Sequence, residues 1–501
     1  MVISQLTSSD FFAVQGQYLG GFYVNFNIMD NINELETRPM GRLLWQYALP
    51  TVASQVVTSI YNIVDRIFLG NSIGDGKMLL AALTITFPIM NIIHAFGSLV
   101  GAGSSARMSI VLGRKDVRWA EKILGNSMLL TFLFGFIFVV GGYLWMHPII
   151  NLFADGASQP VIDAACEYMY IVLPGMFLLT VTYNLVGLIR SSGYPMKGMW
   201  IMVGGAVLNI LLDFIFISEM GWGMKGAAWA TTLSMAASAT VAVLHFVQPH
   251  SFIRFKRHAW APKLYIFRNI LAIGISPFSM NVAAFAVVAV LNRQLIRFGG
   301  DDAMTVYGAA NSYMGLIFMV LLGLCQAMQP IAGYNYGARR NDRLREVYIL
   351  TMKVCVLIGI LGAASALIFP RTIIGFFNSE PEILDMGAPA LRYLMVFCPL
   401  IAFTVTNSQL FQSIDQPWIA IVTSLSRQVI FLIPLSLILP DLLLDFNDGD
   451  GVTGVWQACA ICDVLGAVLS AVLLLTHRQV FRMDYVPPER KPRKELGPKE
   501  N

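Results

Sequence analysis

The sequence predicts an all-α membrane protein with twelve transmembrane helices in two parallel six-helix lobes, and three observations predict this fold class. Of 501 residues, 56% are hydrophobic and only 13% are charged, whereas a soluble domain carries roughly 25% charged residues. From Arg42 onward the chain contains twelve apolar runs, counted at about 20 residues for each crossing of a bilayer. The second six runs repeat features of the first six, so both halves face the same way across the membrane.

The first six runs cover residues 46–69, 79–105, 123–146, 161–188, 197–218 and 226–248, and the second six cover 268–297, 306–330, 348–369, 387–412, 418–440 and 453–476. They divide the chain into an N-terminal lobe (39–250), an inter-lobe linker (251–267), a C-terminal lobe (268–482) and a charged tail (483–501). Residues 1–38 are too polar to span and lack a signal-peptide pattern, so we expect a disordered extension there. Met29 is a second candidate start, which would leave residues 1–28 outside the working protein.

The charges of the loops predict the orientation. Alternate loops are basic, through Arg107, Arg114, Lys115, Arg118, Lys122, Arg190, Lys197, Arg254, Lys256, Arg257, Lys263, Arg268, Arg339, Arg340, Arg343 and Arg345. The opposite loops are acidic, through Asp75, Asp155, Asp301, Asp302, Glu380, Glu382, Asp441, Asp445, Asp448 and Asp450. The positive-inside rule therefore predicts that both termini lie in the cytoplasm. We expect the protein to lie in the plasma membrane. Because the basic runs flank membrane spans, they do not indicate a nucleic-acid partner.

An internal repeat supports the two lobes. Pro50 and Asp65 lie fifteen residues apart, as do Pro277 and Asn292. Three further segment pairs are similar: GRKDVRWAEK and GARRNDRLREV, EYMYIVLPG and RYLMVFCPL, and RSSGYP and QSIDQP. All four matches are offset by 222 to 227 residues, so one duplication explains them together.

The chain resembles the multidrug and toxic compound extrusion (MATE) family of secondary transporters over nearly all of its length outside the two tails. The resemblance rests on Pro50, Asp65, LGRKD (112–116), GLIRSSGYP (187–195), NILLD (209–213), GMKGAAWAT (223–231) and SRQ (426–428). It implies two lobes that form a V around a central cavity. It also implies an antiporter that exports amphipathic, often cationic, compounds by alternating access in exchange for protons or sodium ions. We expect a monomer with no further cofactor.

Four polar residues of the N-terminal lobe are candidates for the coupling site. An acid inside the membrane is a functional-site hypothesis, because charge in hydrocarbon is costly, although Asp65 could instead pair with Arg66 near the surface. At about 1.5 Å per residue, Asp65, Asp213 and Thr231 all fall in the outer third of the membrane, and Asn209 lies one helical turn from Asp213. The resemblance implies that these four positions bind the coupling cation or proton, so sodium is the only metal we expect.

The C-terminal lobe contains a second candidate polar site, made of Asn292, Arg427 and Asp463. Asn292 stands where the first half has Asp65, and an amide cannot titrate. Arg427 and Asp463 reach nearly the same depth in their spans. Either they form a buried ion pair, which is favoured because intramembrane charges usually pair, or Asp463 holds a cationic substrate or a second proton.

Other residues allow two interpretations each. Pro50 is either an ordinary proline of a first helical turn or, as the resemblance implies, a conformational hinge that bends when the Asp65 region changes protonation. Six polar residues inside spans either line a cavity or make helix–helix hydrogen bonds, and we favour the hydrogen bonds. They are His94, Glu167, Gln55, Asn184, Asn281 and Gln326.

Two other functions fit less well. A flippase for lipid-linked precursors, from the same wider superfold, would favour a cavity rich in Arg or Lys that binds pyrophosphate. The spans instead hold acids and few cations. A membrane enzyme would need clusters of His or acids at the loop mouths, and the sequence has none, so we expect no catalytic residue.

Overall fold

The computed structural model describes residues 30–70, 76–154, 156–248, 251–444 and 450–482, and all regular structure in these ranges is helical. The helices are α2 (Asp30–Thr37), α3 (Met40–Gly70), α4 (Gly76–Gly113), α5 (Val117–Phe153), α6 (Gln159–Ser191), α7 (Pro195–Asp213), α8 (Gly223–Val247), α9 (Leu264–Gly337), α10 (Asn341–Ile368), α11 (Pro370–Gly375), α12 (Pro381–Met395), α13 (Cys398–Ser413), α14 (Pro417–Leu425), α15 (Ile433–Leu442) and α16 (Gly451–Thr476). Two π-helical segments, η1 (Phe214–Glu219) and η3 (Ser426–Leu432), and two 3₁₀ turns, η2 (Arg257–Trp260) and η4 (Arg478–Phe481), complete the set. The expected charged tail and Asp75, Asp155, Asp445 and Asp448 lie outside the described residues.

The described helices account for the twelve expected spans. Nine continuous helical stretches among the described residues are long and apolar enough to cross a membrane; two of them are composite, α7 with η1 and α14 with η3 and α15. The pair α12 and α13, bent by 41°, makes one more. One of the nine, α9, is two helices joined at Gly300, whose φ of 61° and ψ of −153° break the helix. α3 is less apolar but has 31 residues, enough to span. The prediction of twelve transmembrane helices is therefore confirmed.

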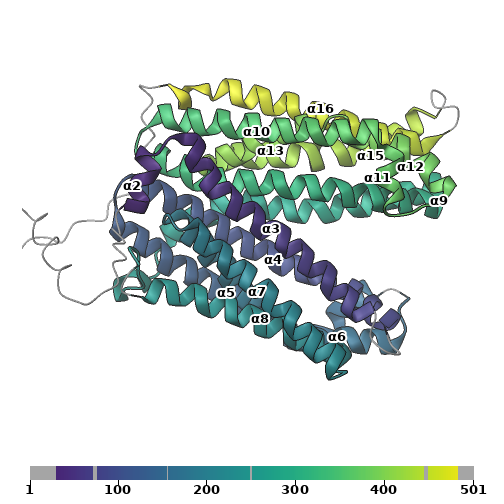
Figure 1. The fold of residues 1–501 in the computed structure, drawn as a ribbon, viewed down its shortest axis with the longest axis horizontal. Helices are drawn as coiled ribbons and strands as arrows, with labels where there is room; N and C mark the ends of the chain where they lie inside the picture. The colour runs from purple at the N-terminus through teal and green to yellow at the C-terminus, as the bar shows by residue number, and fades with distance from the viewer. Residues whose placement is uncertain (1–29, 71–75, 155, 249–250, 445–449, 483–501) are drawn as a thin grey trace, which may run out of the picture.

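The helices form two lobes that meet at one end and separate at the other, which gives the molecule the expected V shape (Figure 1). One lobe contains α4 to α8, the other α9 to α16, and α3 runs diagonally from one toward the other. α2 lies at the end where the lobes meet. We call this the closed end and the opposite one the open end.

The duplication is visible in four turns at helix ends. Lys115, Gly193, Arg339 and Asp415 all have a positive φ, of 60°, 94°, 59° and 60°. In each turn the next residue donates its amide to the carbonyl five residues back, the arrangement that closes a helix with a left-handed residue. Lys115 and Arg339 lie 224 residues apart, and Gly193 and Asp415 lie 222 apart. The repeat inferred from weak sequence matches thus has a backbone counterpart.

At the closed end, α4 and the second arm of α9 approach backbone to backbone. A Cβ atom on Gly113 would lie 2.0 Å from the Tyr334 carbonyl oxygen, and one on Gly337 would lie 2.0 Å from the Ile110 carbonyl oxygen. Residues 113 and 337, like 110 and 334, are 224 apart, so the two contacts are related by the repeat. Only glycine permits such an approach between membrane helices.

A second pair of contacts joins the first helix of each half to the second helix of the other half. A Cβ atom on Gly274, in the first arm of α9, would lie 1.7 Å from the Leu99 carbonyl oxygen of α4. A Cβ atom on Gly323, in the second arm, would lie 2.7 Å from Val52 Cγ2 of α3. The repeat again relates the two contacts. Val52 and Gly274 lie 222 residues apart, and Leu99 and Gly323 lie 224 apart.

The helix α2 corrects one expectation. Residues 1–29 lie outside the described residues, but Asp30–Thr37, within the extension expected to be disordered, form a helix. Leu35 is fully buried, and its carbonyl oxygen accepts hydrogen bonds from Asn335 Nδ2 and Arg343 Nη2, both at 3.3 Å. These contacts fix α2 to the C-terminal lobe.

Charged side chains also join the lobes at the closed end. Arg107 of α4 forms an ion pair with Asp415, in the turn after α13, at 2.8 Å. Glu36 of α2 lies between two of the repeat-related turns, 3.7 Å from Lys115 Nζ and 3.9 Å from Arg340 Nη1. The closed end is therefore held by polar contacts as well as by helix packing.

The linker between the lobes is shorter than expected and packs on α5. α9 begins at Leu264, inside the expected linker (251–267). Asn126 Nδ2 donates to two carbonyl oxygens of the linker, and Lys256 pairs with Glu121 at 2.8 Å. Because Glu121 is almost fully buried, the linker covers a charge that would otherwise lie against apolar side chains.

Gly113→Ala should lower the free energy of unfolding by about 1–3 kcal/mol, the range for overpacking, because the new Cβ would collide with the Tyr334 carbonyl oxygen. Gly308→Ala on α9 is the control, because nothing lies within 4 Å of its Cβ position. Thermal unfolding in detergent, read by size-exclusion chromatography, compares the two. If both variants were as stable as the wild type, α4 and α9 would not be held together at this point.

Candidate functional site

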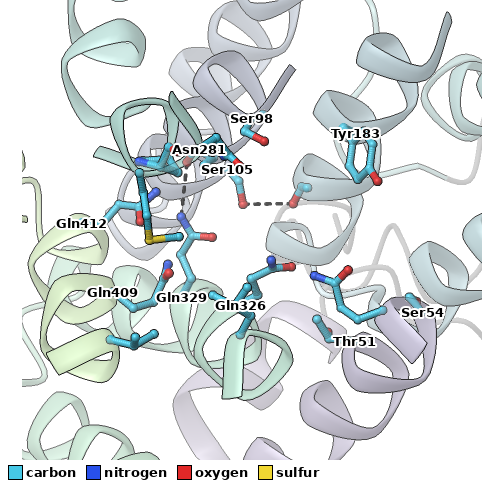
Figure 2. A pocket seen from close by; sticks show the side chains of 18 of the residues that line it. Thr51, Ser54, Ser98, Ser105, Tyr183, Asn281, Gln326, Gln329, Gln409 and Gln412 are labelled. Carbon is cyan, nitrogen blue, oxygen red and sulfur yellow. Dashed lines mark hydrogen bonds between the residues drawn. The ribbon is translucent and has the colours of Figure 1, made fainter. Parts of the chain in front are cut away.

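A cavity of about 340 Å³ lies between the lobes. Its walls come from α3, α4, α6 and α7 on one side and from α9, α13, α14 and η3 on the other. Figure 2 shows Gln326, Gln409 and Gln412 on the side of the C-terminal lobe and Thr51 and Tyr183 on the side of the N-terminal lobe. The cavity is therefore a compartment to which both lobes contribute.

Four of the six polar residues from the sequence analysis line this cavity. They are Gln55, His94, Asn281 and Gln326. We had favoured hydrogen bonds between helices for these residues, but all four also take the other role, that of lining the cavity. Asn281 donates to a carbonyl of its own helix, and Gln326 accepts a hydrogen bond across the cavity from Arg190 at 3.3 Å.

The other two residues lie elsewhere. Asn184 is fully buried in the N-terminal lobe; its Oδ1 accepts from Ser104 at 2.7 Å, and its Nδ2 donates to Thr131 at 3.2 Å. This is the helix–helix role expected for it. Glu167 forms an ion pair with Lys225 at 2.8 Å.

The charges that line the cavity differ from the expectation of acids. The lining residues include two arginines, Arg190 and Arg427, and within the part of the chain that the structure describes no Asp or Glu lines it. The intramembrane acids lie behind the wall instead. The argument that the spans hold acids and few cations did not describe the surface that a substrate would meet, and the twelve runs themselves contain eight Arg and Lys against five Asp and Glu.

The four candidate coupling residues come together inside the N-terminal lobe. Asp213 is fully buried, and Asn209 and Thr231 are nearly so. Asn209 Nδ2 lies 3.5 Å from Thr231 Oγ1, and Asp65 interacts electrostatically with Asp213. None of the four lines the cavity. This cluster, Asp65, Asn209, Asp213 and Thr231, is called the acid cluster below.

The acid cluster has buried oxygens without hydrogen-bond partners. Both carboxylate oxygens of Asp213, Oδ1 of Asp65 and Oδ1 of Asn209 are buried and accept no hydrogen bond from the described residues. Buried polar atoms in proteins are rarely left unpaired. Four such oxygens in one place suit a small cation or protons. Among the described residues no group of three or more His, Cys, Asp and Glu could hold a metal, so a cation here would also need amide and hydroxyl oxygens.

Three helices position the acid cluster. Asp65 lies on α3, Asn209 and Asp213 on α7, and Thr231 on α8. α7 ends at Asp213, where the π-helical segment η1 begins. Such segments widen the helix by one residue and occur often at functional sites.

Two tyrosines belong to the same region, and the sequence analysis missed them. Tyr168 of α6 is almost fully buried, and it interacts electrostatically with Asp65, Asp213 and Tyr61. Tyr61 lies one helical turn before Asp65, a spacing that could have indicated it. Tyr168 had no such local signal.

In the C-terminal lobe, Arg427 Nε donates to Asp463 Oδ1 at 2.5 Å, and Asp463 is buried. The ion pair favoured from the sequence is therefore present. Arg427 also lies in the π-helical segment η3 and lines the cavity. Asn292 is half-buried, and its side chain forms no hydrogen bond or ion pair with the described residues, so it is not joined to this pair.

Pro50 does not occupy a first helical turn. α3 begins at Met40, so Pro50 lies ten residues inside the helix and lines the cavity. A proline in a helix interior removes one hydrogen bond and favours a kink. The interpretation as a first-turn proline is wrong, and the hinge stays a prediction.

Comparisons with known proteins agree with this architecture. The family model described as MatE matches residues 50–215 and 273–438, one match in each half. The multidrug export protein MepA of Staphylococcus saprophyticus is 23% identical over 444 residues, which cover 88% of this chain and 95% of MepA. A crystal structure of MATE in the bent conformation has a TM-score of 0.82, with 23% identity over 90% of this chain and 98% of that one. The outward-facing conformation of a multidrug resistance MATE family transporter has a TM-score of 0.81 and is 24% identical; the match covers 90% of this chain and 98% of that one.

Asp463→Asn should lower the free energy of unfolding by about 3–5 kcal/mol, because it leaves the Arg427 guanidinium inside the lobe without its counter-charge. The double variant Arg427→Gln with Asp463→Asn should recover most of that loss. Chemical unfolding of both single variants and the double variant gives the coupling energy. A single variant as stable as the wild type would show that the pair contributes nothing to the fold.

Proposed function

The chain belongs to the MatE family, and on this premise we propose that it is a secondary active antiporter. It exports amphipathic compounds from the cytoplasm by alternating access, in exchange for protons or sodium ions. One observation carries the proposal: α3 contains both an acid of the buried cluster, Asp65, and four residues of the cavity wall, Pro50, Thr51, Ser54 and Gln55. A change at one site can therefore move the other.

We propose that the closed end faces the cytoplasm and that both termini lie on that side of the plasma membrane. The basic turns around Lys115 and Arg340 lie at the closed end, and the positive-inside rule favours the cytoplasmic side for them. The structure would then be open to the outside. The multidrug export activity named for MepA supports transport toward that side.

The coupling step is neutralisation of the acid cluster. Keeping two carboxylates ionised in a poorly hydrated place costs free energy, because desolvation and like-charge repulsion both disfavour the charged forms. Protons, or a sodium ion held by oxygens of the acid cluster, would remove that cost. If neutralisation stabilises one lobe conformation more than the other, its differential binding energy drives the exchange.

The second candidate function is movement of a lipid-linked precursor, and one observation favours it: the two lining residues that carry a fixed charge are arginines. Arg427 is already neutralised by Asp463. A pyrophosphate would then meet one arginine rather than a cluster, so this function ranks second.

Asp65→Asn and Asp213→Asn should each reduce gradient-driven transport to the background of empty liposomes, because each removes a titratable group of the acid cluster. Asn292→Ala should have a milder effect, because it removes none. Asp163→Asn, a surface carboxylate on α6, is the matched control. Dye transport is measured in proteoliposomes with proton and sodium gradients imposed separately. Wild-type rates in both Asp variants would place the coupling elsewhere, and Asp463 would be tested next.

Pro50→Ala should slow transport several-fold while the protein stays folded, because the restored amide strengthens α3 at the proposed hinge. Pro88→Ala, also inside a helix but away from the cavity wall, is the control. Initial rates in proteoliposomes are compared at equal protein content. Unchanged turnover in Pro50→Ala would remove the hinge from the mechanism.

A further inference from the structure

We propose that the cavity between the lobes binds the anionic group of its substrate at Arg190, so that the exported compounds are amphipathic anions. This inference rests on the transport function proposed above and names its substrate class. It departs from the cationic substrates expected from the sequence. Three observations carry it: the charges of the cavity wall, the contacts of Arg190, and the side chains around it.

The fixed charges on the cavity wall are positive. Arg190 and Arg427 line it, and no described Asp or Glu does. Asp65 and Asp213 lie within the N-terminal lobe and outside the lining, and Asp463 is buried behind Arg427. An organic cation in this cavity would find no counter-charge at its surface, whereas an anion would.

The two arginines are not equivalent. Asp463 neutralises Arg427, so that pair offers little net attraction to an anion. The Arg190 side chain forms no ion pair with any described residue. Its guanidinium donates a hydrogen bond from Nη1 to Gln326 Oε1 at 3.3 Å. A guanidinium carries five N–H donors in a planar fork that matches a carboxylate. Arg190 thus has the capacity to bind an oxyanion directly.

The position of Arg190 gives the site its shape. It lies in the last turn of α6 and is half-buried. Gly198 of α7 lies against it, and a Cβ atom there would come 3.2 Å from Arg190 Cγ. The small residue leaves room for the arginine stem along α7. The hydrogen bond to Gln326 reaches from the N-terminal lobe to the C-terminal lobe, so an anion bound there would contact both.

The rest of the wall suits an amphipathic molecule. Amides such as Gln326, Gln409 and Gln412 face the same space (Figure 2). Four methionines, Met199, Met202, Met280 and Met319, supply flexible apolar surface, which adapts to varied shapes. The volume of about 340 Å³ is at the lower end for small-molecule sites. A single carboxylate or sulfonate on an apolar body fits these features better than a multiply charged phosphate.

The test uses two probes with one fluorophore. Dansylglycine carries a carboxylate and dansylcadaverine an ammonium group. In proteoliposomes with an imposed gradient, the wild type should move dansylglycine faster than dansylcadaverine. Exchange of an anion for an entering cation moves charge in one direction, so a membrane potential that favours cation entry should accelerate dansylglycine transport. One-for-one exchange of a cationic substrate would be electroneutral and unaffected.

Arg190→Gln should reduce dansylglycine transport at least tenfold, and Arg190→Lys should retain part of it. Arg392→Gln is the matched control: Arg392 also lies in the last turn of its helix, but it is exposed and away from the cavity. Gln326→Glu keeps Arg190 and places a carboxylate beside it, so it should also reduce dansylglycine transport. This variant tests the site if Arg190→Gln fails to fold.

The outcomes separate the two proposals. Transport of dansylcadaverine without dansylglycine would overturn the anionic substrate class and leave the antiporter function standing. Wild-type transport of dansylglycine by folded Arg190→Gln, or by Gln326→Glu, would overturn the role of Arg190. Transport of neither probe, under proton and sodium gradients alike, would contradict the transport function itself.

Discussion

The approach of α4 to both arms of α9 is the contact on which the rest of the structure depends. Gly113, Gly274 and Gly337 let backbones come so close that a single methyl group would collide with a carbonyl oxygen. In a membrane, where lipid is as apolar as the side chains, such close packing drives helix association. It holds the lobes together at one end, and the cavity exists because they separate beyond it.

Much of this architecture could be predicted, because a bilayer leaves the chain few options. Apolar runs must become helices whose backbone groups are paired internally, so the twelve spans followed from composition and length. The depth of a residue in the membrane is also nearly fixed by its position along a straight helix, because each residue adds the same rise. That is why Asp65, Asp213 and Thr231, which are distant in sequence, could be expected in one place, where the structure has them.

Rotation of a helix about its own axis could not be predicted in the same way. Lipid-facing and cavity-facing surfaces are both largely apolar, so the sequence could not tell which face of α3 or α9 turns inward. Gln55 and Asn281 line the cavity only because the lobes separate there. α2 escaped prediction for another reason: it is short and polar, and the partners of its Leu35, Asn335 and Arg343, lie 300 and 308 residues away in the chain.

The repeat-related contacts of Val52 with Gly323 and of Gly274 with Leu99 bear on how such a chain could arise. Each half packs part of its first helix against the second helix of the other half, while α3 also contacts α7 of its own half. A chain of half this length would lose these cross-contacts unless a second copy supplied them. The arrangement thus has the form of a symmetric dimer whose two subunits were fused, so that each half covers part of the other.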